Sequence, residues 1–176
     1  MESLITSSGR ATLSTQVIGS GEPIVFLHAR VADRRMWAHQ MREIGASHQA
    51  IAYDRRGFVE TVAEAEDHSA VRDLIAVLES VARGFPAILV ACSQGGGIAL
   101  DAALRYPSHV RGLVLIAPNV TGAPKITHAT RVEELVTRLA AADAKHDIKA
   151  AIAIRRTLWL DGPLQHEGRV TGEARR

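Results

Sequence analysis

One segment, AILVACSQGGGIALDAALRYP (Ala87–Pro107), constrains the fold of this chain more than any other. Its first five residues form an apolar run that indicates a buried strand, and Gly95–Tyr106 follows the periodicity of a helix. Ser93 lies between them, so the strand must turn into the helix within a few residues. Such a turn strains the backbone at Ser93 and needs small neighbours two positions away, where Ala91 and Gly95 stand. The turn lifts the Ser93 hydroxyl above the end of the sheet, where ligands bind in open α/β folds.

Short apolar runs alternate with amphipathic segments along most of the chain. This alternation predicts an α/β fold in which a mostly parallel sheet carries helices on both faces. Residues 2–19 hold two weaker strand-like stretches separated by Ser8 and Gly9, which predict an antiparallel hairpin at an edge of the sheet. The remaining strands are expected at residues 24–29, 50–54, 87–91 and 112–118, and the helices near residues 33–45, 69–83 and 95–106.

The pattern changes after Pro118, and it divides the chain into three parts. Residues 1–120 are expected to form the α/β core, residues 121–163 a helical segment, and residues 164–176 a polar tail without regular structure. Thr130 and Glu133 have the spacing of a capping box at the start of one helix, and Asp147–Leu160 is the expected second helix.

Composition and charge favour an ordinary soluble protein over a nucleic-acid or membrane partner. The 176 residues are 47% hydrophobic and 23% charged, which suffices for a packed core, and the formal net charge is only +2. Basic residues are scattered apart from the pairs Arg34–Arg35, Arg55–Arg56 and Arg155–Arg156, which are expected on the solvated surface.

Cys92 is the single cysteine of the chain, so an intrachain disulfide and a cysteine-rich zinc site are both excluded. Nothing in the sequence implies a metal or another cofactor. The N-terminus lacks the basic region and following apolar run of a signal peptide. No apolar stretch is long enough to span a bilayer. A cytoplasmic location is therefore expected.

The Ala87–Pro107 segment resembles the nucleophile elbow of the α/β-hydrolase fold family, G-x-S-x-G, with Ala91 in place of the first glycine. Three other segments resemble that family in the same order. Residues 24–37 look like the strand and H-G-x-x loop of the oxyanion hole, and residues 52–61 are similar to D-x-R-G-x-G-x-S/T. Residues 112–118 look like the strand after the nucleophile helix. The resemblance covers the N-terminal portion of the family fold, and residues 126–163 look more loosely like the start of a cap over the active site.

The resemblance implies a role for each residue of the site. Ser93 would be the nucleophile of a serine hydrolase, and backbone N–H groups would hold the oxyanion. The residues implied are Arg30 and Gln94 as oxyanion donors, and His28, Ala91 and Gly95 as supports of the site. His28 would shape the oxyanion loop rather than act as the base.

Four neighbouring side chains have simpler expected roles. Arg30 is bulky and charged where the family often has glycine; its side chain is expected to point to solvent, the alternative being contact with an acidic group of a substrate. Cys92 is expected to be a small buried hydrophobe, and Asp54 to organise its turn. Val59 replaces a glycine of the family pattern, and a positive φ there would cost about 1–2 kcal/mol.

The family's catalytic acid and base have no counterpart that can be recognised in this sequence. The triad order is serine, then Asp or Glu, then His, but Asn119 cannot carry a negative charge where some members place the acid. The later histidines, His109, His128, His146 and His166, lack the family context. A copy that is truncated on its C-terminal side, and weakly active or inactive as it stands, is therefore expected. Residues 112–118 would form an open sheet edge, which predicts self-association.

Three functions are consistent with these observations. The first is a serine hydrolase of a small ester, lactone or similar carbonyl compound, and the second is a non-catalytic ligand-binding protein of the same fold. The third is a nucleotide-binding domain, but its G-x-G-x-x-G pattern belongs in the first strand–helix turn, and the glycines at 95–97 lie in a later one.

Overall fold

A computed structural model describes residues 2–124 and 127–172 of the chain. The chain forms two compact units, Met1–Gly122 and Ala123–Arg176. Within the described residues, no helix is both long enough and apolar enough to cross a membrane.

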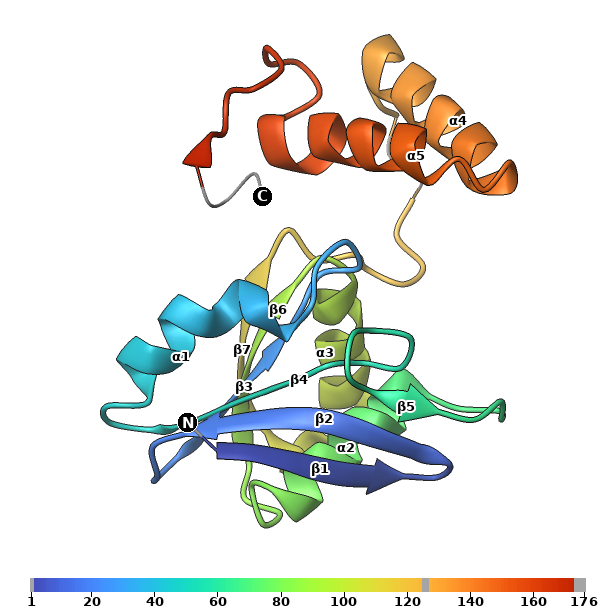
Figure 1. Cartoon of the computed structure of the whole chain (residues 1–176). Coiled ribbons are helices and arrows are strands. Elements are labelled where there is room, and N and C mark those ends of the chain that lie inside the picture. The colour runs from blue at the N-terminus through green and yellow to red at the C-terminus, as the bar shows by residue number, and fades with distance from the viewer. Residues whose placement is uncertain (1, 125–126, 173–176) are drawn as a thin grey trace. The chain divides into compact units, whose positions relative to one another are not determined.

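The first unit is built on one mixed sheet with the strand order β1-β2-β4-β3-β6-β7, and β5 pairs with β2 (Figure 1). The strands β4, β3, β6 and β7 run parallel to one another, while β2 pairs antiparallel with β1, β4 and β5. Their bounds are β1 Glu2–Ser8, β2 Ala11–Ile18, β3 Pro23–Leu27, β4 Gln49–Tyr53, β5 Val62–Ala63, β6 Ala87–Cys92 and β7 Val110–Ile116.

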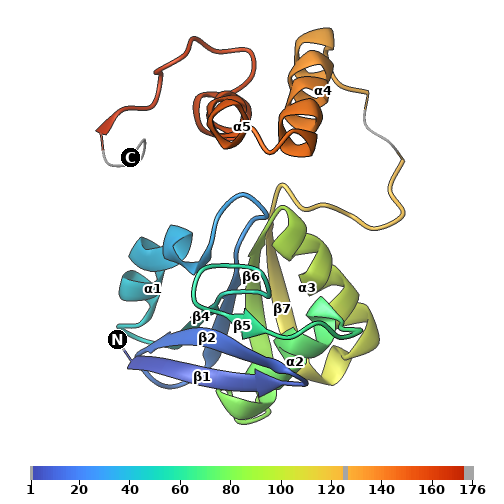
Figure 2. The ribbon, with the colours of Figure 1, turned by 45° about the vertical axis from the view of Figure 1, so that its right-hand side comes forward.

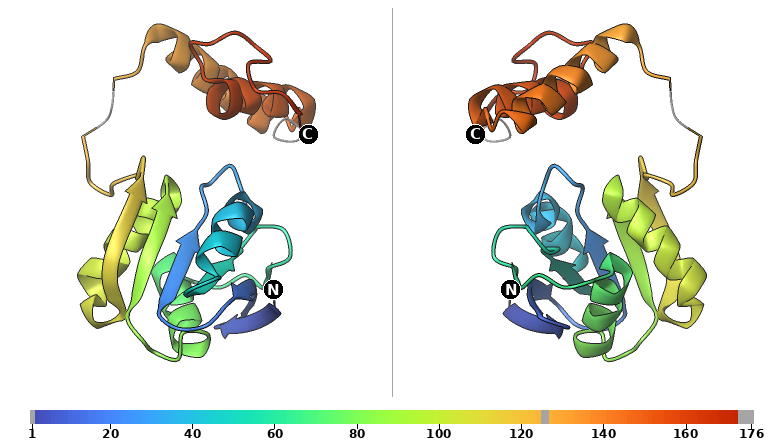
Figure 3. Two further views of the ribbon diagram at one scale, coloured as in Figure 1. Left: turned by 90° about the vertical axis from the view of Figure 1, so that its left-hand side faces the viewer. Right: turned by 90° about the vertical axis from the view of Figure 1, so that its right-hand side faces the viewer.

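Helices cover both faces of this sheet (Figures 2 and 3). On one face, Trp37 and Met41 pack against Phe26 of β3 and Ala52 of β4. The opposite face carries the larger core, to which α2 and α3 contribute. The elements are a 3₁₀ turn Arg34–Trp37, α1 Ala38–Ile44, α2 Ala70–Ser80 and α3 Gln94–Arg105. The predicted fold class, a mostly parallel sheet with helices on both faces, is confirmed.

The two ends of the strand order differ in character. The hairpin of β1 and β2 forms one edge, as the weaker strand patterns predict. At the other end, β7 pairs only with β6 among the described residues, and its Val114 and Ile116 are 49% and 45% exposed. Pairing of this apolar edge with a second copy of the chain stays a prediction.

The first helical turns begin largely where the sequence places them. Asp33 accepts a hydrogen bond from the Arg35 N–H, although the segment that it caps starts as a 3₁₀ turn. Ser69 occupies the N-cap position of α2, but its side chain makes no capping hydrogen bond. The expected end of this helix near residue 83 is wrong, because α2 ends at Ser80 with Val81 as its C-cap residue; Gly84, with φ of +74°, lies in the turn that follows.

The second unit contains α4 Thr130–Ala144, α5 Ile148–Arg155 and a π-helical turn Arg156–Asp161. Its small core is formed by Leu135, Leu139, Ala142, Ala151, Ile154 and Leu158. The predicted capping box is wrong, because Ala129 is the N-cap residue and no side chain caps α4. The Ala129 carbonyl instead accepts from the N–H groups of Val132 and Glu133.

The first part of the polar tail is a hydrogen-bonded loop. The Asp161 carboxylate accepts from the N–H groups of Gly168 and Val170, at 3.0 and 3.1 Å. The Arg169 Nε donates to the Asp161 carbonyl at 2.6 Å. The tail expected to lack structure from 164 to 176 thus has a defined path as far as residue 172, and residues 173–176 lie outside the described residues.

Candidate active site at the β6–α3 turn

Ser93 occupies a strained turn between β6 and α3. Its φ is +52° and its ψ −115°, a backbone conformation that residues other than glycine rarely adopt. Its N–H donates to the Ile116 carbonyl at 3.0 Å, and its carbonyl accepts from the Asn119 N–H at 2.9 Å. The end of β7 and the segment that follows it therefore hold the Ser93 backbone from both sides, which is how surrounding structure maintains a strained residue.

The glycines after Ser93 have no room for a side chain, because neighbouring segments lie close to them. A Cβ at Gly95 would lie 2.6 Å from the Leu27 carbonyl oxygen, and one at Gly96 would lie 2.7 Å from the Pro118 Cβ. Ala91 is fully buried at the end of β6. A side chain at position 95 would therefore force α3 and β3 apart, whereas the need for a small residue at 91 stays a prediction.

The turn that follows β3 lies beside the turn that carries Ser93. Leu27 pairs with Ala91 in the parallel ladder of β3 and β6, so both strands end at the same edge of the sheet. Arg30 lies in the turn after β3 with an exposed side chain. Gln94 begins α3, in the first turn, where helix N–H groups lack partners within the helix and the dipole favours negative charge.

His28 is buried and hydrogen-bonded at the end of β3. Its ring is fully buried, Nδ1 lies 2.8 Å from the Ala29 carbonyl oxygen, and Nε2 accepts from the Arg55 N–H at 3.2 Å. Burial, and next the nearby Arg55 charge, lower the pKa of His28. Its imidazole is therefore neutral at pH 7, with both nitrogens committed to backbone groups.

Arg55 is part of the site's surroundings, although the sequence placed it on the solvated surface. It is 6% exposed, and its Nη2 donates to the carbonyls of His28 and Ala29, both at 3.1 Å. Its Nη1 donates to the Gln94 Oε1 at 2.7 Å. Its guanidinium also lies over the Phe58 ring, 5.0 Å from the centroid.

The prediction of surface positions for the arginine pairs is wrong for two further residues. Arg34 is 6% exposed, and it donates to Asp54 through both its backbone N–H and its guanidinium. The Arg56 side chain is 9% exposed and forms ion pairs with Asp73 and Glu66. These arginines were missed because the acceptors that bury them come from distant parts of the chain. Arg35 and Arg156 are exposed, as expected, and Arg155 is partly exposed.

The turn after β4 carries a second strained residue. Val59 has a φ of +36° and is 57% exposed. A positive φ at this position is the condition under which a valine in place of the family glycine carries a conformational cost. Asp54 organises the turn, since its carbonyl accepts from the Thr61 hydroxyl at 2.6 Å and its carboxylate holds Arg34.

We assign no catalytic acid or base for Ser93 among the described residues. His109 follows α3 at its far end, 3.8 Å from Glu79 and beside the Tyr106 ring. His128, His146 and His166 belong to the second unit. Burial raises the pKa of the Cys92 thiol, so this neighbour of Ser93 is protonated at neutral pH. Cys92 is partly rather than fully buried, and it packs against the apolar cluster that includes Phe26 and Trp37. Among the described residues, no cluster of His, Cys, Asp or Glu could hold a metal ion.

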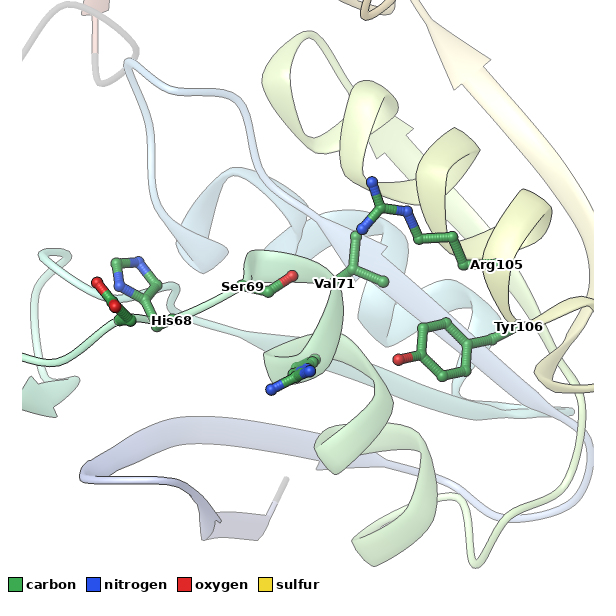
Figure 4. A pocket seen from close by; sticks show the side chains of 7 residues that line it. His68, Ser69, Val71, Arg105 and Tyr106 are labelled. Atoms are coloured by element: carbon green, nitrogen blue, oxygen red, sulfur yellow. The ribbon is translucent and has the colours of Figure 1, made fainter.

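A separate groove of about 300 Å³ lies between the start of α2 and the end of α3 (Figure 4). His68, Ser69 and Val71 line it on one side, and Arg105 and Tyr106 on the other. Ser93 precedes the first residue of α3, and a helix of twelve residues is about 18 Å long. The groove is therefore at the opposite end of α3 and does not belong to the Ser93 site.

The sheet is mostly parallel, and a strained serine lies between the C-terminal end of the inner strand β6 and the helix that follows it. This arrangement defines a class of α/β proteins with an elbow turn. The model of the alpha/beta hydrolase family matches residues 24–175. The chain belongs to this family.

Individual relatives agree with this assignment. A 2-(acetamidomethylene)succinate hydrolase of Mesorhizobium japonicum is 34% identical over 113 residues, which are 61% of this chain and 40% of the relative. The AB hydrolase superfamily protein YisY of Bacillus subtilis is 28% identical over 138 residues, 74% of this chain and 52% of that protein. The chain thus spans about half the length of these curated relatives.

The fold agrees with solved structures as well. The chain matches an esterase from Exiguobacterium antarcticum with a TM-score of 0.68 and 25% identity, over 86% of this chain and 59% of the esterase.

Proposed function

We propose that this chain carries the nucleophile half of a serine hydrolase that acts on a small ester, lactone or similar carbonyl compound. One observation carries the proposal: Ser93 sits in a strained turn at the start of α3, beside the turn after β3 that holds Arg30. The backbone N–H groups of Arg30 and Gln94 are the proposed oxyanion donors.

The chemistry follows from this arrangement. The Ser93 Oγ attacks the substrate carbonyl carbon, its proton passes to a base, and the carbonyl π electrons move onto oxygen as the tetrahedral oxyanion. The two N–H groups and the α3 dipole stabilise that charge. Collapse of the intermediate expels the alcohol and leaves an acyl-enzyme, which water hydrolyses to the acid. The base is unassigned, so this proposal concerns the nucleophile and the oxyanion site only.

Intact mass after incubation with a fluorophosphonate tests whether Ser93 is activated. We expect one adduct on the native chain, and none on Ser93→Ala. Ser69→Ala is the matched control, because Ser69 also precedes a helix but has an ordinary extended backbone, with φ of −128°; it should keep the adduct. No adduct on a folded native chain would contradict an activated Ser93 and favour a non-catalytic ligand-binding protein of this fold.

We further propose that the substrate carries an acidic group that meets Arg30. The Arg30 side chain is exposed beside the proposed oxyanion site, and the Mesorhizobium relative is named for hydrolysis of a substituted succinate. An exposed ion pair contributes about 1 kcal/mol or less, so its loss weakens binding about fivefold.

Binding of monomethyl succinate and of methyl butyrate, followed by the shift in melting temperature, tests the role of Arg30. Arg30→Ala should weaken the acidic ester about fivefold relative to the neutral one. Arg35→Ala is the control, since Arg35 is exposed nearby but paired with Asp33, and it should leave the ratio unchanged. An equal effect of both variants would refute a specific contact at Arg30.

A further inference from the structure

We propose that Arg55 is a positioning residue that fixes both backbone donors of the oxyanion hole. This inference rests on the proposed function of Ser93. It deepens that function, because it names the group that ties the turn after β3 to the start of α3.

The first tie acts on Arg30 through the geometry of the peptide bond. The Arg55 Nη2 holds the Ala29 carbonyl oxygen at 3.1 Å, and this carbonyl shares a planar peptide unit with the Arg30 N–H. In a trans peptide the C=O and N–H bonds point in opposite directions, and the structure contains no cis peptide among the described residues. Anchoring the oxygen therefore directs the Arg30 N–H to the side away from Arg55.

The second tie reaches the helix that carries the other donor. The Arg55 Nη1 donates to the Gln94 Oε1 at 2.7 Å, while Nη2 also holds the His28 carbonyl at 3.1 Å. One rigid guanidinium thus spans two chain segments that are far apart in sequence. The planar fork of an arginine can do this, whereas the single ammonium of a lysine cannot hold the same set of acceptors.

The charge of Arg55 favours an anion at the site. Its hydrogen-bond acceptors among the described residues are the carbonyls of His28 and Ala29, the Gln94 amide and the His28 ring, all of them neutral. The nearest carboxylate along the chain, Asp54, is occupied by Arg34. Burial lowers the pKa of Arg55, yet a guanidinium stays protonated at neutral pH. No hydrogen-bond acceptor of Arg55 in the described part of the chain is negatively charged. An oxyanion between the Arg30 and Gln94 donors would provide a nearby counter-charge.

The adjacent Arg56 provides a matched control within the same turn. Its side chain is also largely buried and donates four hydrogen bonds, but its acceptors are Asp73, Glu66 and the Ser8 carbonyl. None of these groups belongs to the turn after β3 or to α3. Loss of the Arg56 side chain should weaken the contacts among Ser8, Glu66 and Asp73, and leave the Arg30 and Gln94 N–H groups in place.

Hydrogen exchange of the full chain, read by mass spectrometry, tests the positioning directly. In Arg55→Lys, the amides of residues 28–36 should exchange about tenfold faster, including Ala32, which donates to the Ala29 carbonyl; those of residues 94–97 should also accelerate. Arg56→Lys should leave both segments as in the native chain. Unchanged exchange of both segments in a folded Arg55→Lys protein would overturn the proposal, whether or not Ser93 reacts.

Reaction with the fluorophosphonate separates a positioning role from general loosening. Arg55→Lys should lower the maximal rate of Ser93 phosphonylation about tenfold to hundredfold, and leave the half-saturating reagent concentration unchanged. Gln94→Ala removes only the α3 tie and should lower the rate by a smaller factor. Gln49→Ala, which removes one side-chain hydrogen bond at the other end of β4, should have no effect.

The two proposals fail in different ways. A native chain that does not react with the reagent, while Arg55→Lys still accelerates exchange at both segments, contradicts the activation of Ser93 and leaves the positioning by Arg55 supported. A reactive native chain whose rate is unaffected by Arg55→Lys overturns the role of Arg55 and leaves the nucleophile supported.

Discussion

Ser93 and Val59 are both non-glycine residues with positive φ in turns that follow parallel strands, yet the two turns bear their strain differently. The Ser93 backbone is hydrogen-bonded on one side by Ile116 at the end of β7 and on the other by Asn119 in the segment after it, and Ser93 is partly buried. Val59 is 57% exposed, and the hydrogen bonds that close the turn around it join residues of the turn itself: the Phe58 N–H donates to the Arg55 carbonyl, and Thr61 donates to the carbonyls of Phe58 and Asp54. Strain at Ser93 is enforced by several elements, whereas strain at Val59 is a local cost of the side chain.

The largest effect is expected where the enforcing contacts of Ser93 are broken. Gly95→Ala places a Cβ 2.6 Å from the Leu27 carbonyl, so the backbones of α3 and β3 must separate. We expect a loss of about 2–3 kcal/mol in the free energy of unfolding and loss of Ser93 labelling. Chemical denaturation measures the first and intact mass the second.

Gly112→Ala is the control for that variant. A Cβ at Gly112 meets only the Ile88 Cγ1 at an ordinary 3.9 Å, so its stability should stay within about 0.5 kcal/mol of the native value. Equal stability of the two variants would mean that the close approach at Gly95 does not enforce the turn.

A smaller effect, of opposite sign, is expected when the strain at Ser93 itself is relieved. Ser93→Gly removes the Cβ from a residue with φ of +52°, and should raise the free energy of unfolding by about 1 kcal/mol after the added entropy of the unfolded chain is subtracted. Ser93→Ala keeps the Cβ and should match the native stability. If both variants have the same melting temperature, the strain at Ser93 is negligible.

The smallest gain is expected at Val59, where an exposed turn has room to relax. Val59→Gly should stabilise the chain by about 0.5–1 kcal/mol and leave the rate of Ser93 labelling unchanged. Val62→Gly is the control, because Val62 is also exposed but lies in strand β5; it should be destabilising. A Val59→Gly protein less stable than the native chain would show that the valine side chain stabilises the turn.

The regular elements and the elbow were predictable because their signals are local. Apolar runs and helical periodicity locate the strands and helices of the first unit, and the small residues around Ser93 specify a tight turn whose steric cause lies in the adjacent β3. The cap of α4 was mispredicted for the opposite reason. Its capping-box spacing is a weak pattern, and the backbone carbonyl of Ala129 satisfies the same N–H groups.

The buried arginines show which features cannot be predicted from the residues adjacent in sequence. A pair of arginines after a strand is most often solvated, and nothing near Arg55 in the sequence reveals its acceptors. Those acceptors are the backbone carbonyls of His28 and Ala29 and the side chain of Gln94, which the parallel sheet brings together. The role of such a residue depends on which turns meet at a sheet edge, and that is settled only by the three-dimensional fold.

The register of β3 and β6 has a consequence for how this chain acquires its native state. Leu27 meets Ala91 across a parallel ladder, so the contact closes a long loop, whereas the β1–β2 hairpin closes through a short turn. Hairpins form in about 1–10 μs, and non-local parallel pairing is far slower because loop entropy is lost before contacts form. We therefore expect the positive-φ conformation of Ser93, and the adjacent turn after β3, to form late in folding, after the β1–β2 hairpin.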